Sequence, residues 1–219
     1  MRTYFLRFML KSDATFGRGD GVAGLVDTEV QHDGYGCPYL GGRALKGLLV
    51  SECADLRAAL PDAIRPRWEE AAQHLFGSPG SALEDNALLS IGDAPLPSDL
   101  RAAIAQDVKR KTLRREEVLE SLTALRRQTA IDGNGVAKEG SLRTMRVILR
   151  ETPFEAALHF TEEPTEDDLA LLAACIKAFR RAGTGLTRGR GRLIAELLDE
   201  SHKAITGKVF EKFRLAVSV

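Results

Sequence analysis

Residues 183–192 combine four glycines with three arginines, and we call this segment the glycine–arginine loop. Glycine adopts positive φ angles and has no Cβ, so the backbone can approach a bound group closely. Arginine supplies planar donors for phosphate oxygens and stacks on nucleobases. The composition predicts an RNA contact, and a mobile turn with solvated arginines is the competing interpretation. The predicted contacts are Gly183, Gly185, Arg188, Gly189, Arg190, Gly191 and Arg192.

The surroundings of this loop exclude a dinucleotide-binding fingerprint. Thr165 and Asp168 form a capping-box pattern, and apolar residues at helical spacing follow them as far as Phe179. Residues 193–198 are typical of a strand. The glycines therefore follow a helix and precede a strand, which is the reverse of the dinucleotide motif.

A glycine pair, Gly41 and Gly42, opens another predicted helix, in which leucines recur at helical spacing. Arg43 and Lys46 lie about one turn apart at its start. Free N–H groups and the positive end of the helix dipole favour an anion at such a position. The segment predicts phosphate contacts through Arg43 and Lys46, but an ordinary glycine-entered helix fits it equally well.

A third basic group, Arg126, Arg127, Arg143 and Arg146, flanks a turn that contains glycine and asparagine. Basic residues that alternate with small polar ones suit a hairpin lying along a nucleic-acid backbone. We therefore predict that these four arginines contact RNA, although a plain exposed hairpin explains the pattern equally well.

Four aspartates, Asp13, Asp20, Asp27 and Asp33, are spread along the glycine-rich residues 11–39. A loop carboxylate beside RNA can deprotonate a ribose 2′-hydroxyl or hold Mg²⁺ or another divalent cation through water. Loop aspartates more often cap turns. The scattered histidines do not support a two-histidine ribonuclease, no serine or cysteine nucleophile arrangement is recognisable, and nothing indicates an organic cofactor.

Charge is segregated along the chain. The 219 residues include 31 Lys and Arg and 31 Asp and Glu, so the formal net charge is zero. Proteins that bind nucleic acid through their overall charge are usually basic. Here residues 180–192 hold five arginines and no acid, whereas residues 162–168 are acidic. Any RNA contact must therefore be local.

Cysteine usage indicates a reducing compartment. Cys37, Cys53 and Cys175 are far apart and form no C-x-x-C pair, which argues against a disulfide framework and a structural zinc site. The apolar residues 3–10 are too short for a signal peptide or a membrane span, and Arg7 interrupts them. We expect a cytoplasmic protein without a membrane partner.

Hydrophobic periodicity and turn residues predict the order strand, helix, insertion, strand, strand, helix, strand. The expected strands are residues 3–10, 87–91, 144–149, 153–160, 193–198 and 209–217, with a short one near 25–30. The expected helices are residues 42–60, 67–76, 99–125 and 165–183, with a turn at 77–81. Residues 109–117 are nearly all charged and indicate a solvated helix or a flexible excursion.

This order is that of an α+β, ferredoxin-like (RRM-like) domain, an antiparallel sheet with helices on one face. We expect residues 144–149 and 153–160 to pair with each other. We also expect one domain over residues 1–219, with a core at about 1–60 and 144–219 and an insertion with a thumb-like hairpin at about 61–143.

Four ordered segments, spanning nearly the whole chain, resemble the RAMP superfamily of CRISPR-associated proteins. The glycine–arginine loop after the second core helix is the most specific of them. Residues 27–47 resemble the loop and first helix of the small backbone subunits of type III effector complexes. Leu75-Phe-Gly77 with Ser90-Ile-Gly-Asp-Ala94, and residues 127–132 with 136–140, complete the resemblance.

The resemblance implies a subunit that lines the crRNA, stacks with copies of itself and with other effector subunits, and inserts a thumb-like hairpin between guide and target RNA. In the backbone group, the aspartate that matches Asp27 cleaves target RNA with the help of a metal ion. Asp27 is therefore the implied catalytic residue, and Asp33 is the second choice. The resemblance implies no firm metal ligand, although Asp27 is a candidate.

Two departures from the family pattern keep other functions open. Leu40-Gly-Gly-Arg-Ala44 stands where the family has Pro-Gly-Ser-Ser, so Arg43 replaces the expected hydroxyl contacts, and the basicity of many relatives is absent. The alternative is a non-catalytic subunit that binds the crRNA 5′ handle or bridges subunits. A stand-alone enzyme for precursor crRNA ranks last, because no cluster of histidine, tyrosine or lysine is evident.

Overall fold

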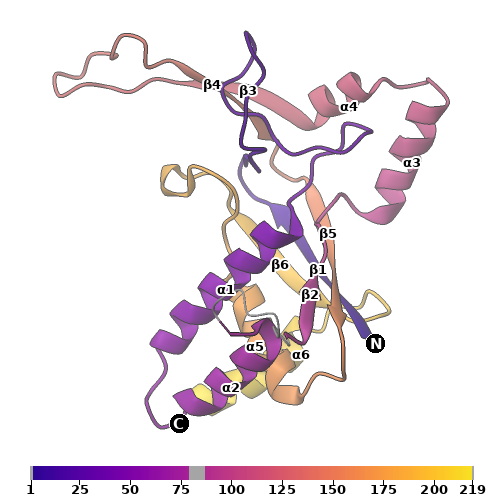
Figure 1. Cartoon of the computed structure of the whole chain (residues 1–219), viewed down its shortest axis with the longest axis vertical. Helices are drawn as coiled ribbons and strands as arrows, with labels where there is room; N and C mark the ends of the chain where they lie inside the picture. Colours follow the sequence, from indigo (N-terminus) through magenta and orange to yellow (C-terminus); the bar gives the residue numbers. More distant parts are fainter. Residues whose placement is uncertain (1, 79–86, 219) are drawn as a thin grey trace.

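An antiparallel sheet of four strands forms the body of the computed structural model, which describes residues 2–78 and 87–218 (Figure 1). The strands are β1 (Arg2–Leu10), β2 (Leu89–Ile91), β5 (Pro153–Phe160) and β6 (Leu193–Leu198), in the spatial order β2-β5-β1-β6. Side chains alternate along β1, so Leu6 and Phe8 are buried while Arg7 and Met9 face outward. The sheet therefore has one apolar face to cover.

Helices α1 (Gly42–Ala58) and α5 (Glu166–Ala178) cover that face. Nearly every residue of α5 after its first turn is buried, because the sheet lies on one side and other helices enclose the rest. The capping box forms as predicted, with the Thr165 N–H donating to Asp168 Oδ2 at 2.8 Å and the Asp168 N–H donating to Thr165 Oγ1 at 3.1 Å. The order β1-α1-β2-β5-α5-β6 on this sheet confirms the predicted ferredoxin-like fold.

Two further helices, α2 (Arg65–Phe76) and α6 (Thr206–Val217), pack against α5. The predicted strand at 209–217 is wrong, because its apolar residues, apart from the exposed Leu215, recur at helical spacing and pack as one face against the core. Trp68 of α2 packs on Phe213 of α6 with ring centroids 4.7 Å apart. No helix among the described residues is long and apolar enough to cross a membrane.

A long excursion leaves the sheet between β2 and β5, which are neighbours in the sheet (Figure 1). It consists of α3 (Ser98–Lys109), α4 (Arg115–Leu122), β3 (Thr123–Gln128) and β4 (Arg143–Ile148). β3 and β4 form a separate two-stranded sheet, a hairpin that projects from the body, and β4 also makes isolated bridges to Ala14 and Thr28. Within residues 61–143, α2 and β2 thus join the body, while α3, α4 and β3 belong to the excursion.

Three local predictions fail here. Residues 144–149 do not pair with 153–160, because both edges of β5 are already taken by β1 and β2. The helix predicted over 99–125 is divided into α3 and α4 by a turn at Lys111, whose φ of 60° is left-handed, and residues 123–125 begin β3. Residues 25–30 make isolated bridges instead of a strand. The turn expected at residues 77–81 falls mostly outside the described residues.

Phe213→Ala tests the position of α6. Phe213 is 6% exposed, so the truncation leaves a cavity beside Trp68, and we expect the free energy of unfolding to fall by about 3–5 kcal/mol. Urea unfolding followed by Trp68 fluorescence measures this. Leu215→Ala, on the exposed side of α6, is the control and should change stability by less than about 0.5 kcal/mol. Equal losses in both variants would contradict the observed helix.

Candidate nucleic-acid interface

The glycine–arginine loop docks on residues 11–17, which continue the chain directly after β1. The Thr184 N–H donates to the Thr15 carbonyl at 3.0 Å. At the other end of the loop, the Gly191 N–H donates to the Asp13 carbonyl at 2.9 Å. Backbone hydrogen bonds therefore fix both ends of the loop.

Gly183 is required by this docking, and Gly191 is required where the loop closes on Ala182. Gly183 and Gly191 have φ values of 93° and 68°. A Cβ on Gly183 would lie 2.5 Å from the Thr15 carbonyl oxygen, and one on Gly191 would overlap the Ala182 carbonyl oxygen. Gly189 also has a positive φ of 77°, but a Cβ there would meet no atom within 4 Å. The backbone around Gly189 is thus open to an approaching ligand.

The β3–β4 hairpin meets residues 11–17 from the other edge. Ala14 and Ile148 exchange backbone hydrogen bonds of 3.0 and 2.7 Å. Arg188 of the loop donates to Gln128 Oε1 at 3.3 Å, and Arg190 contacts the sulfur of Met145. The loop and the base of the hairpin therefore share one surface, although they are far apart in sequence.

Four of the predicted RNA-binding arginines lie at this junction. Arg143, Arg188 and Arg192 are exposed there and Arg190 is half-buried, whereas Arg127 is exposed on the opposite face of the hairpin. A hollow of about 480 Å³ lies between the hairpin and the loop. Its lining residues are Gln128, Thr129, Ala130, Ser141, Arg143 and Arg188. The arrangement gives an electrically neutral chain one locally positive surface.

The two other predicted hairpin arginines are paired with carboxylates. Arg126 Nη2 lies 2.8 Å from Asp13 Oδ2, with about half of the Arg126 side chain exposed. Arg146 is 8% exposed, and its Nε donates to the two carboxylate oxygens of Glu29 at 2.9 and 3.2 Å. Because Arg143 and Arg146 are three residues apart on a strand, they point to opposite faces. Arg146 was predicted to contact RNA, but it lies beneath the surface that the exposed arginines form.

Asp27 lies at the molecular surface beside the hairpin. Its N–H donates to the Thr144 carbonyl at 2.7 Å, and its Oδ2 accepts the Thr144 N–H at 2.7 Å. Among the described residues, none donates a hydrogen bond to Oδ1. One carboxylate oxygen is thus anchored while the other can face a ligand.

Both carboxylate oxygens of Asp33 accept hydrogen bonds from within the protein. Its Oδ1 accepts the N–H groups of Tyr35 and Cys37 at 2.8 and 3.1 Å, and its Oδ2 accepts Arg101 Nε at 2.8 Å. Arg101 belongs to α3, so Asp33 caps a turn and anchors the excursion. This hydrogen bond also raises the pKa of Arg101. The geometry favours Asp27 over Asp33 as a group that could act on RNA.

The start of α1 faces the glycine–arginine loop across a hollow of about 310 Å³. Its N-terminus already holds an anion, because the Gly42 N–H donates to Asp93 Oδ1 at 2.7 Å. Arg43 is exposed and Lys46 is half-buried on the first turns of the helix. Any phosphate contact at this helix would therefore come from these two side chains and not from the Gly42 amide. The hollow is lined by Phe16, Gly17, Gln31, Leu40, Ala44, Gly47, Leu48 and Gly183.

Residues 2–78 and 87–218 contain no group of three or more His, Cys, Asp or Glu that could hold a metal ion. Mg²⁺ often binds through only one or two carboxylates together with substrate phosphates. A single exposed carboxylate such as Asp27 fits that mode, in which the nucleic acid would supply the remaining ligands.

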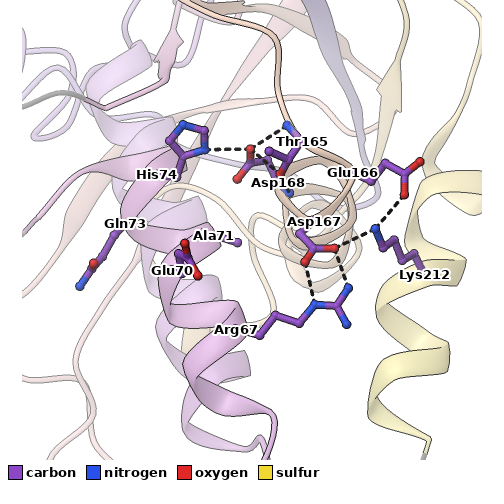
Figure 2. Close-up of a pocket in the computed structure, with 10 residues that line it drawn as sticks. All are labelled: Arg67, Glu70, Ala71, Gln73, His74, Thr165, Glu166, Asp167, Asp168 and Lys212. Carbon is purple, nitrogen blue, oxygen red and sulfur yellow. Dashed lines mark hydrogen bonds and ion pairs between the residues drawn. The ribbon is translucent and has the colours of Figure 1, made fainter.

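Another hollow, about 760 Å³, lies at the other end of the molecule, between α2, α5 and α6 (Figures 1 and 2). Its cations are already paired, since both Arg67 and Lys212 bond to Asp167. Chiefly through the hydrogen bond from Arg67, the pKa of Asp167 falls from 3.8 to about 2. His74 Nδ1 lies 2.9 Å from the buried Asp168. These contacts join three helices and do not form part of the basic surface.

A family model described as the RAMP superfamily matches residues 7–194. The chain belongs to the RAMP superfamily. The match runs from β1 into β6, so it includes Asp27, the hairpin and the glycine–arginine loop, and α6 lies outside it. This confirms the family resemblance that the sequence motifs carry. No curated protein sequence matches the chain.

Solved structures with this RAMP fold come from CRISPR complexes. A chain of the "Type III-B Cmr-beta bound to cognate target RNA" is 14% identical with a TM-score of 0.63, over 95% of this chain and 99% of that one. A chain of apo Type III-B Cmr-beta is 15% identical with a TM-score of 0.62, over 91% and 98%. A chain of a "Type IV-B CRISPR Complex" is 12% identical with a TM-score of 0.59, over 91% of each. At these identities, the likeness shows the shared fold.

Sequence reasoning missed several residues that build the interface. Glu29 and Asp93 act as partners of Arg146 and of the Gly42 N–H, and neither stands in a recognisable capping or charge pattern. Gln128 bonds to Arg188 across 60 residues of sequence. The sequence did indicate that Arg146 differs from Arg143. The two are an odd number of residues apart on a strand, so their side chains point to opposite faces.

Gly191→Ala and Gly189→Ala form a matched pair, because both positions have a similar positive φ but different surroundings. A left-handed alanine costs about 1–2 kcal/mol, so Gly189→Ala should lower the free energy of unfolding by that amount. Gly191→Ala must also displace the Ala182 carbonyl, so we expect a clearly larger loss. Thermal unfolding of both variants measures the difference. Equal losses would contradict the close docking of the loop.

Proposed function

We propose that this RAMP protein is a crRNA-binding backbone subunit of a type III-like CRISPR effector complex. The observation that carries the proposal is the joint basic surface of the glycine–arginine loop and the hairpin base on a chain with no net charge. Family membership and the CRISPR complexes in which the same fold occurs support it.

The surface suits a single RNA strand. Exposed guanidinium groups neutralise phosphates, and the open backbone around Gly189 allows close approach. The hairpin also exposes apolar side chains, Ile131, Val136 and Leu142. Apolar side chains on such a projection can wedge between bases or stack against them. The proposed partners are therefore crRNA, target RNA, other effector subunits and further copies of this chain.

RNA binding by the full-length chain tests the main proposal. The probe is a fluorescein-labelled single-stranded RNA titrated between about 50 and 200 mM NaCl. Arg188→Gln and Arg192→Gln should each weaken binding and reduce the slope of log K against log salt by about 0.7. Arg214→Gln, on α6 and paired with Glu211, is the control and should leave the slope unchanged. Absence of binding by the wild-type chain at the lowest salt would refute the proposal.

We further propose that Asp27 acts on guide-paired target RNA. Oδ1 of Asp27 would accept the proton of a ribose 2′-hydroxyl as the 2′-oxygen attacks the neighbouring phosphorus. The bond from phosphorus to the 5′-oxygen of the next nucleotide would break, giving a 2′,3′-cyclic phosphate and a 5′-hydroxyl that takes its proton from water. A divalent cation shared between Asp27 and phosphate oxygens would supply charge neutralisation. The carboxylate is exposed and its orientation is fixed by Thr144, which suits such a role.

One observation favours a non-catalytic alternative. Asp27 makes two hydrogen bonds to the backbone of Thr144, so its carboxylate also acts as an anchor for the hairpin. A subunit with only this use of Asp27 would bind the crRNA 5′ handle or bridge other subunits. Native mass spectrometry separates the two, because a backbone subunit occurs in several copies per complex.

Asp27→Asn distinguishes catalysis from anchoring, because asparagine can still accept the Thr144 N–H but cannot act as a base. In the assembled effector complex, we expect target-RNA cleavage to fall by about 100-fold or more while crRNA binding is retained. Asp33→Asn tests the second choice, and Asp20→Asn in the same loop is the control. Cleavage at the wild-type rate in Asp27→Asn would assign Asp27 to the anchoring role.

A further inference from the structure

Arg146 is buried, yet it touches three segments outside its own strand. Its Nε donates to Glu29, and its Nη1 donates to Thr123 Oγ1 at 3.2 Å. Its N–H donates to the Thr28 carbonyl at 3.0 Å, and its carbonyl accepts the Thr15 hydroxyl at 3.0 Å. One residue thus joins both strands of the hairpin to the two loop segments beside it.

Glu29 completes this network from the loop side. Its side chain is 3% exposed, and Oε1 also accepts the Val30 N–H at 2.9 Å. Asp27 lies two residues before Glu29 and bonds to Thr144, which lies two residues before Arg146. Residues 27–29 and 144–146 therefore run side by side, with the buried ion pair at one end and the exposed Asp27 carboxylate at the other.

The chemistry of the pair suits orientation better than ligand binding. A buried ion pair is tolerated when its geometry is good and its other polar atoms find partners. Here Arg146 Nη1 also bonds to Thr123 and Glu29 Oε1 to the Val30 N–H, and neither residue has a fully buried side-chain polar atom without a partner among the described residues. The planar guanidinium fixes direction in a way that a lysine ammonium would not. Glu29 holds Nε and Thr123 holds Nη1 of a side chain that is only 10% exposed, so an RNA phosphate has little access to this guanidinium.

We infer that Arg146 and Glu29 are positioning residues, whose ion pair sets the hairpin against the loop that carries Asp27. Arg146 acts through this pair and does not contact RNA. The consequence for RNA rests on the proposed function, whereas the positioning itself does not.

The experiment compares Arg146→Gln, Glu29→Gln and the double variant in the full-length chain, with Arg143→Gln as the matched exposed control on the same strand. The first readout is the salt dependence of binding to fluorescein-labelled single-stranded RNA. Arg143→Gln should lower the slope by about 0.7, and Arg146→Gln should leave it unchanged.

The second readout is amide hydrogen exchange at residues 26–30 and 143–146. Arg146→Gln and Glu29→Gln should each speed exchange there by roughly tenfold or more, because a charge is left unpaired in a buried site. The double variant should recover part of the protection, since no unpaired charge remains. Arg143→Gln should not change it. If Arg146→Gln does not fold, the salt dependence of RNA binding is measured on the double variant instead.

Each possible result bears on either the positioning role or the proposed function. A slope that falls by about 0.7 in Arg146→Gln makes Arg146 an RNA contact and overturns the inference. Unchanged exchange in the single variants, or a double variant as unprotected as the singles, overturns the positioning role. A wild-type chain that binds no RNA overturns the proposed function instead, and the exchange result still decides the positioning role.

Discussion

Backbone hydrogen bonding on both edges of residues 2–17 determines where the rest of the molecule lies. Along β1, these edges hold β5 and β6, so the sheet is complete. Beyond Leu10, the same chain leaves the sheet but keeps both edges in use, with β4 on one side at Ala14 and the glycine–arginine loop on the other at Asp13 and Thr15. The fold and the candidate interface are therefore built on one continuous stretch of backbone. A change of register in β1 would move both.

Charge pairing explains how a neutral protein presents a basic surface. Several acids of the loop regions are matched to a specific arginine: Asp13 to Arg126, Glu29 to Arg146, and Asp33 to Arg101. The acidic start of α5 is matched by Arg67 and Lys212 at the opposite end of the molecule. The arginines around the glycine–arginine loop have no acid of their own segment beside them. Local pairing, and not composition, decides which charges remain to meet a polyanion.

The sequence predicts the main helices and strands of this protein better than the tertiary partners of individual side chains. Alternation in residues 3–10 and 153–160 and the capping box at Thr165 depend on local chemistry, and these elements form as predicted. The helix at 206–217 was missed because its apolar residues also fit a short strand pattern. Only the packing of Phe213 against neighbouring helices favours a helix over a strand. Arg146 and Asp33 were misjudged as available groups because Glu29 and Arg101 reach them from distant elements. Tertiary partners of this kind leave no periodic signal.

The excursion between β2 and β5 has a consequence for how such a protein can vary. The Glu155 N–H donates to the Pro95 carbonyl at 2.9 Å, so the residues just before and just after the excursion lie side by side. The entropic cost of closing such a loop grows only with the logarithm of its length. The projecting hairpin can therefore lengthen, shorten or be exchanged while the sheet below it stays the same. Relatives with this sheet can therefore differ in the length of the hairpin without a change in the rest of the fold.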